Sequence, residues 1–294
     1  MATKNVTDTL CANAAGVLAC LRKADFADLN NAINASLSIQ QQGTNYWPVI
    51  DGEIVARVSL SQLLEGAFFK IPYVLGTNND EGAYFIDFGI NNDADLAESL
   101  ASPVLNDASI PQLMASYPLV DPDSAIQGLK NSELNDTIVL QWKRAATLST
   151  DIDMEAPTRK SAQIWMDKTS EGAPIYISNA NTTNAIADQY LGAIPYMFYS
   201  LNGSGCEGDL PPFVGGNPFL DRPQSYLDMA AVMSGFWVGY FNGGVPQYKN
   251  PWPAYNATTD KIMILDAQPT HLNVRVGTDE RVARLDLVNS ILYG

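Results

Sequence analysis

The chain has 294 residues, and 32 acidic against 17 basic side chains give it a formal net charge of −15. That charge argues against nucleic acids and anionic membrane surfaces as partners, because both are bound by basic patches. With 46% hydrophobic residues the chain can bury a sizeable core, and it has no apolar run long enough to predict a transmembrane segment. We therefore expect a folded, globular chain.

Apolar spacing and turn residues predict alternating helices and strands. Loops are expected at 1–23, at 39–57 (with short strands around Pro48 and Gly52) and at 181–223. Helices are expected at 25–38, 59–69, 93–100, 110–117, 124–127, 133–151 (in a helical region that ends at Pro157), 161–169 and 226–241, and from Asp279 onward. Strands are expected at 73–75, 174–178, 261–265 and 271–276, the last two as a hairpin. This order indicates an α/β fold.

The stretch that organises the chain begins with a short apolar strand, Tyr73-Val74-Leu75. A polar turn at 76–80 follows it, and then Glu81. A carboxylate just past the carboxyl end of a parallel strand lies where open α/β sheets collect their functional groups. The alternative is a plain strand-to-helix turn, with Glu81 in the first helical turn. Spacing alone leaves both interpretations open.

Several motifs occur in a fixed order around this stretch. They are Pro48-Val49-Ile50-Asp51-Gly52, the pair Leu63-Leu64 before Gly66, and Gly76-Thr77-Asn78-Asn79-Asp80-Glu81-Gly82. Further motifs follow at Arg144–Ala146, Ala173–Tyr176, Phe236–Phe241 and Trp252–Tyr255. In this order they resemble the type-B carboxylesterase/lipase family, which includes the cholinesterases and the fungal lipases, and the resemblance extends to Leu292.

The resemblance implies one partial α/β-hydrolase domain over residues 1–294. It would be the C-terminal portion of that fold, a mostly parallel central sheet flanked by helices, without the N-terminal half that carries the nucleophile elbow. By the same resemblance Glu81 is the acid of a Ser-Glu-His triad that acts on lipophilic carboxylic esters without a cofactor. Phe85 and Phe88 are candidates for the remaining pocket wall, with core packing as their alternative role.

The other two members of such a triad are not evident in the sequence. No G-x-S-x-G elbow occurs, and the single histidine, His271, lies near the end of the chain where a surface role is expected. At the position of the family's histidine the chain has Tyr190, or a deletion after Ala193. A tyrosine, with a pKa near 10, is a poor general base. We therefore expect the chain to be inactive alone, and a non-catalytic protein-binding module is the alternative.

The junction after Ala193 can be a short deletion or a splice or gene-model boundary, and the sequence leaves both open. No spacing of His, Cys and carboxylates predicts a metal site, and no glycine-rich loop has the context of a nucleotide site. A strand at 73–75 without the preceding strands would expose a sheet edge. We therefore expect poor solubility, or docking onto an N-terminal half or another polypeptide.

Six sequons point to a secreted ancestry. An odd cysteine count is ambiguous by itself, but the family resemblance implies a disulfide between Cys11 and Cys20, and leaves the redox state of Cys206 open. The glycosylation candidates are Asn5, Asn34, Asn135, Asn181, Asn202 and Asn256. The N-terminus has no apolar stretch of the kind found in signal peptides, so we expect an extracellular origin without a signal peptide in this chain.

Overall fold

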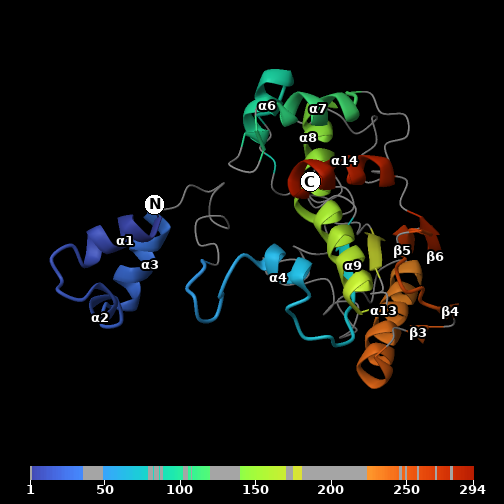
Figure 1. The fold of residues 1–294 in the computed structure, drawn as a ribbon, viewed down its shortest axis with the longest axis horizontal. Helices are drawn as coiled ribbons and strands as arrows, with labels where there is room; N and C mark the ends of the chain where they lie inside the picture. Colours follow the sequence, from blue (N-terminus) through green and yellow to red (C-terminus); the bar gives the residue numbers. More distant parts are fainter. Residues whose placement is uncertain are drawn as a thin grey trace. The chain divides into compact units, whose positions relative to one another are not determined.

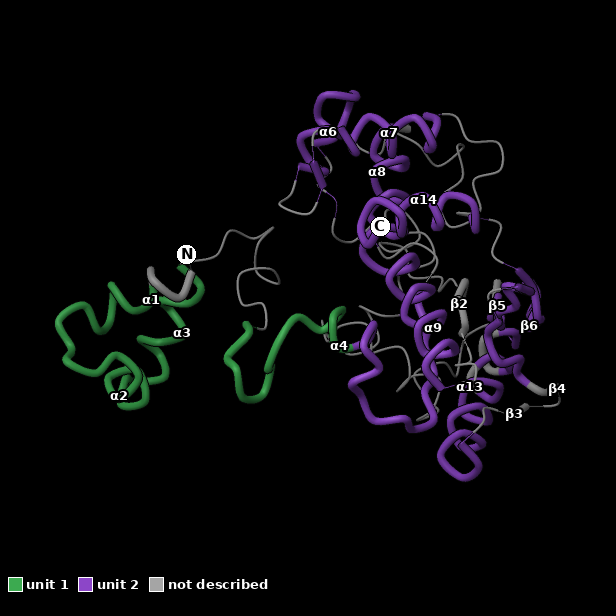
Figure 2. Tube along the Cα trace, viewed as in Figure 1, with its two compact units in different colours: residues 1–62 green, residues 63–294 purple. Residues whose placement is uncertain are grey.

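The computed structural model describes residues 2–35, 49–78, 82, 86, 89–101, 105–106, 108–119, 140–169, 175–180, 224–244, 247–248, 250–256, 258–268, 270–278 and 281–294. The chain divides into two compact units, residues 1–62 and 63–294 (Figure 2). The expectations for 124–127 and 181–223 lie outside the described residues.

The first unit contains three short helices, α1 (Ala2–Leu10), α2 (Val17–Leu21) and α3 (Phe26–Ala35). The helix expected at 25–38 is confirmed as α3, and the side chain of Asp25 caps it by accepting a hydrogen bond from the Ala27 N–H at 2.8 Å. The loop expected at 1–23 is wrong, because α1 and α2 lie there. The threonine-rich sequence of α1 is a poor helix former, but α1 packs against α3 and buries Val6, and this packing outweighs propensity.

Residues 49–57 form turns and contain no strand, so the short strands expected there are wrong within that stretch. The Asp51 side chain accepts hydrogen bonds from the N–H groups of Glu53 and Val55, both at 2.9 Å. Such local bonds compete with strand pairing. Helix α4 (Ser59–Glu65) follows, as expected, and ends at Gly66, whose positive φ of 69° suits the residue after a helix.

A four-stranded sheet lies at the centre of the second unit, with the order β1-β2-β5-β6. Its strands are β1 (Leu75–Asn78), β2 (Ile175–Ala180), β5 (Lys261–Gln268) and β6 (His271–Thr278). The first three run parallel and β6 is antiparallel to β5, so the predicted hairpin and the strand at 174–178 are confirmed. A small ladder pairs β3 (Gln247–Tyr248) with β4 (Asn250–Pro251).

The strand expected at 73–75 is displaced. β1 shares only Leu75 with that prediction and continues through Gly76-Thr77-Asn78, which we expected to form a turn. These four residues pair in register with Ile175–Ser178 of β2. Backbone pairing with a distant strand therefore outweighs the weak strand propensity of glycine and asparagine here.

The helices of the second unit are α6 (Asp93–Leu100), α7 (Ser109–Ser116), α8 (Leu140–Thr150), the π-helix η3 (Asp151–Glu155), α9 (Ala156–Thr169), α13 (Gln224–Gly243) and α14 (Val282–Tyr293). Of these, α9 and α13 pack against the four-stranded sheet, while α6 and α7 lie farther from it (Figure 1). The expected helices in these regions are confirmed within the described residues, which leave out 133–139, except for the break at Pro157. The helical path instead continues through η3 into α9, with Pro157 as the second residue of α9 directly after the π-helical turn.

Two apolar cores stabilise the second unit. One joins α6, α7, α8 and α14 around the fully buried side chains of Leu96, Leu113 and Leu148. The other packs α9 against the sheet, where Ala162 meets Ile262 of β5. Met263 and Leu265 alternate with Ile262 along β5 and are also buried, so both faces of this strand are covered, as is usual in parallel sheets.

A buried arginine also joins three parts of the second unit that are distant in sequence. The Arg159 guanidinium of α9 donates to the Tyr255 hydroxyl at 3.0 Å and to Asp260 at 2.8 Å, and it pairs with Asp286 of α14. Burial and the hydrogen bond to Asp260 raise the pKa of Tyr255 to about 12, so its hydroxyl stays protonated at neutral pH.

Candidate active site at the carboxyl edge of the sheet

Strands β1 and β2 are neighbours and run parallel, with Asn78 opposite Ser178. Their carboxyl ends therefore lie at the same edge of the sheet, about 4.8 Å apart. The segment that contains Glu81 leaves this edge after β1, and the segment that contains Tyr190 and Ala193 leaves it after β2. The two segments therefore begin at the edge where functional groups collect in such sheets.

Several predicted site residues lie outside the described residues: Glu81, Phe85, Phe88, Tyr190, Ala193, Cys206, Asn135, Asn181 and Asn202. Their roles stay predictions. The structure does describe both flanks of Glu81, namely Thr77 within β1 and Gly82 immediately after the glutamate.

Both flanks of Glu81 are held by one helical segment. The Thr77 hydroxyl, which is buried, donates to Oε1 of Glu155 at 2.6 Å. The Gly82 N–H donates to the Thr150 hydroxyl at 2.8 Å. Gly82 also approaches this segment so closely that a Cβ atom there would lie 2.2 Å from the Ala146 carbonyl oxygen. The residues that flank Glu81 are therefore tied to the two ends of η3, Thr77 to its last residue and Gly82 to the residue just before it.

The same segment carries a buried ionic cluster. Arg281 donates to Oδ1 of Asp151 at 2.8 Å, and its second terminal nitrogen lies 3.2 Å from Oε1 of Glu155. The Tyr117 hydroxyl donates to Oδ2 of Asp151 at 2.7 Å. Burial, together with the charge of Asp151, raises the pKa of Tyr117 far above its ordinary value, so this hydroxyl remains a donor. All three charged side chains are almost completely buried.

Sequence reasoning missed this cluster. Asp151 and Glu155 are four residues apart inside a predicted helical region, where charged residues are ordinarily exposed. Arg281, 130 residues beyond Asp151, carries no local signal of a partner. The signal that could have found the cluster is that Asp151 and Glu155 lie among apolar helical residues, since charged side chains that become buried need an opposite charge.

His271 lies at the same edge of the sheet but on another strand. It is the first residue of β6, opposite Gln268 of β5, so three strand spacings, about 14 Å, separate its strand from β1. Its side chain is 51% exposed, and Nε2 lies 3.7 Å from Oδ2 of Asp266. This exposed position at the start of the outer strand β6 agrees with the surface role expected for His271.

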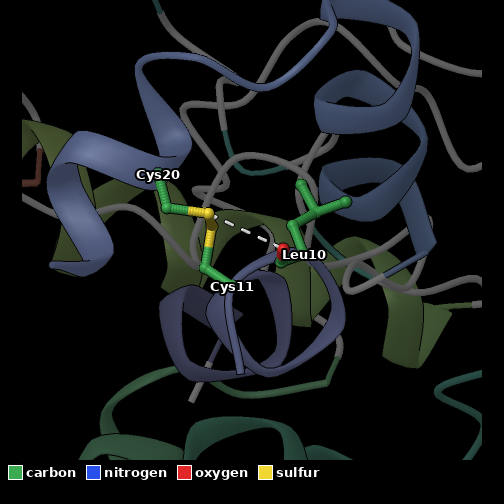
Figure 3. Close-up of a disulfide and its surroundings, with 3 residues drawn as sticks. All are labelled: Leu10, Cys11 and Cys20. Carbon is green, nitrogen blue, oxygen red and sulfur yellow. Dashed lines mark hydrogen bonds between the residues drawn. A yellow bond between two sulfur atoms is a disulfide. The ribbon is translucent and has the colours of Figure 1, made fainter. Parts of the chain in front are cut away.

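The remaining predicted sites that the structure describes lie mostly in the first unit. Cys11 and Cys20 are joined by a disulfide with an S–S distance of 2.05 Å (Figure 3). Asn5 lies in α1. Asn34 of α3 is exposed, and so is Asn256 in the second unit.

Two classes of feature are not found in the described part of the chain. Among these residues no three His, Cys, Asp or Glu side chains are grouped so that they could hold a metal ion. No helix there has the length and apolar character needed to cross a bilayer.

Known proteins share both the sequence pattern and the fold. Secreted lipase 4 of Gibberella zeae is 22% identical over 263 residues, which cover 86% of this chain and 42% of the lipase. Acetylcholinesterase 1 of Caenorhabditis briggsae is 21% identical over 278 residues, covering 87% of this chain and 42% of that enzyme. Carboxylesterase 1C of Rattus norvegicus is 23% identical over 260 residues, covering 83% of this chain and 42% of that enzyme. The chain thus spans 42% of the length of these relatives.

A solved structure, that of EstA from Aspergillus niger, matches with a TM-score of 0.66 and 15% identity over 97% of this chain and 53% of EstA. This match shows an α/β-hydrolase fold, as expected from the sequence. The sequence model of the Carboxylesterase family matches residues 2–284, and the chain therefore belongs to the carboxylesterase family.

Proposed function

We propose that this chain is the acid-bearing part of a carboxylic ester hydrolase. Glu81 would orient the histidine of a Ser-Glu-His triad, and the serine would come from polypeptide beyond these 294 residues. The observation that carries the proposal is the family match over residues 2–284, within which Glu81 follows β1 by three residues. Lipophilic carboxylic esters are the proposed substrates, since a secreted lipase and a carboxylesterase are among the relatives.

The chain alone should not turn over esters. It has no G-x-S-x-G sequence, and its single histidine lies on β6, three strands from β1. Loss of the nucleophile or base of such a triad costs roughly 10⁴–10⁶ in turnover. Loss of the oxyanion hole removes about another 10²–10³.

Further polypeptide would be needed at the open edge of the sheet. Among the described strands, β1 is paired on one side only. Exposed apolar side chains lie in the segment that leads into it, with Phe69 89% exposed, and near the end of α13, where Phe241 is 77% exposed. A hydrogen bond of 2.6 Å from the Tyr240 hydroxyl to the Pro72 carbonyl joins these two regions. We propose that a nucleophile-bearing half, or another polypeptide, covers this surface.

Sequencing the complete transcript tests the proposal. We expect an in-frame G-x-S-x-G upstream of Met1, and either continuous codons from Leu191 to Pro195 or additional codons that encode histidine. Where a histidine is encoded, the extended protein should hydrolyse p-nitrophenyl butyrate. In that protein Glu81→Gln should lower kcat by about 10⁴, by analogy with triads whose acid becomes an amide. The control Glu98→Gln, at an exposed position in α6, should keep full activity.

A non-catalytic protein-binding module remains the second candidate. It is favoured by a sequence without a G-x-S-x-G serine and without a histidine at the position of the family's triad. A transcript without a G-x-S-x-G or an added histidine codon would favour this candidate over the hydrolase. The 294-residue chain alone could also be assayed for ester hydrolysis. If it hydrolyses esters and Glu81→Gln abolishes this activity, both the predicted inactivity and the binding module are refuted.

We also propose that the protein is extracellular, since two of the matched relatives are named secreted lipases. Asn34 and Asn256 are exposed and can accept glycans, as the sequence predicts. Expression through a eukaryotic secretory pathway should give a product whose mass falls on treatment with N-glycosidase F. An unchanged mass would contradict the glycoprotein prediction.

A further inference from the structure

The described residues on either side of Glu81, Thr77 and Gly82, are both held by contacts with residues 150–155. Thr77 is bound to Glu155, and Gly82 is bound to Thr150. Only the four residues 78–81 lie between these two anchors. Two anchors so close together in the sequence would limit where a carboxylate between them can lie.

The segment that provides the anchors has an unusual backbone. Residues 151–155 form a π-helix between two α-helices, and such wide turns occur often at functional sites. Its first and last residues, Asp151 and Glu155, are buried and share the guanidinium of Arg281. Two buried carboxylates with one arginine need additional donors, because each carboxylate can accept several hydrogen bonds.

Hydroxyl groups supply additional donors. Tyr117 donates to Asp151, and Thr77 donates to Glu155. The Thr77 hydroxyl thus joins the ionic cluster to the strand that leads into the turn. Since the hydroxyl oxygen and Oε1 are 2.6 Å apart, as expected for a bond to a charged acceptor, this link is a strong one.

We propose that Glu155 and Arg281 are positioning residues for the Glu81 turn, and that they act through the Thr77 hydroxyl. Arg281 fixes the Glu155 carboxylate, Glu155 fixes the end of β1, and Gly82 is fixed separately by Thr150. This inference rests on the proposed role of Glu81 as the triad acid. The inference adds that Arg281, the residue just before α14, helps to place that acid.

Hydrogen exchange of the complete 294-residue chain, followed by mass spectrometry, tests this coupling. Thr77→Val keeps the shape of the side chain and removes the hydroxyl. We expect amides in peptides covering 78–86 to exchange about tenfold faster, while the β5–β6 hairpin keeps its wild-type rate. Thr77→Ser, which retains the hydroxyl, should restore slow exchange.

Thr147→Val is the matched control. Thr147 is also buried, but its hydroxyl donates to the Lys143 carbonyl within α8 and not to the cluster. It should leave exchange in 78–86 unchanged. Arg281→Lys retains the charge but not the two-pronged contact, and it should accelerate exchange in 78–86 by a smaller factor than Thr77→Val.

Equal acceleration in every peptide of the Thr77→Val protein, or none in 78–86, would overturn the proposal, since either result makes Thr77 an ordinary core residue. This readout does not depend on ester hydrolysis. A protein that shows the local effect but lacks turnover even with its nucleophile half would refute the proposed function and leave the coupling standing.

Discussion

The sharpest stability prediction concerns Gly82. In Gly82→Ala the new Cβ would lie 2.2 Å from the Ala146 carbonyl oxygen, 2.6 Å from the Thr150 nitrogen and 2.8 Å from Cβ of Ser149. Two of these atoms belong to helix backbone and cannot rotate away, so Gly82 must move. Overpacking of this kind costs about 1–3 kcal/mol. Weakening the 2.8 Å hydrogen bond from Gly82 to Thr150 adds about 0.5–1.5 kcal/mol.

We therefore expect Gly82→Ala to lower the free energy of unfolding by about 1.5–4.5 kcal/mol. Urea unfolding followed by tryptophan fluorescence measures it, since four of the five tryptophans lie in residues 63–294. Gly243→Ala is the control, because no atom lies within 4 Å of its added Cβ. It should change stability by less than about 1 kcal/mol, in either direction. If the two variants unfold at the same urea concentration, the close packing of Gly82 on α8 is wrong.

Three further predictions concern stability. Cys11→Ser should lower the unfolding free energy of the first unit by about 2.5–3 kcal/mol and abolish any effect of reductant on its melting temperature. If reductant does not change the melting temperature of the wild-type protein, the disulfide is contradicted. Asp153 is an exposed residue whose carboxylate is partly removed from water, and this raises its pKa: Asp153→Asn should stabilise the protein slightly at pH 7, and this small gain should shrink as the pH falls through the raised pKa towards 3.8. A gain that grows on acidification would refute this reasoning. Arg159→Met should lower the melting temperature by several degrees, because it removes the cation that pairs with Asp260 and Asp286. The control Arg275→Met, at an exposed position, should leave the melting temperature unchanged.

Helices and strands whose bounds are set by neighbouring residues in the sequence were predictable. Helix α6 begins and ends where expected, because the Asn92 side chain accepts from the N–H groups of Ala94 and Asp95 and so fixes its first turn. The β5–β6 hairpin was also predictable, since the apolar run of β5 and the alternating residues of β6 stand on either side of a short polar stretch. The order of the family motifs identified Glu81 as the candidate acid. Its local sequence alone is equally typical of a residue in the first turn of a helix.

Features set by distant partners were not predictable. β1 lies further along the chain than expected, because its bounds depend on pairing with β2, some 100 residues later. The π-helix and the buried pair of Asp151 with Arg281 have no local signature either, since the partners are 130 residues apart. The anchors of the Glu81 turn belong to this second class. The sequence therefore located the candidate acid but not the contacts that hold its flanks.

Arg281 has a consequence for synthesis on the ribosome. Asp151 and Glu155 are made more than 100 residues before Arg281, the cation that both of them contact. Burying two carboxylates without their arginine is costly. The ionic cluster around the π-helix should therefore close only after Arg281 has emerged, so the packing of η3 is completed late in synthesis.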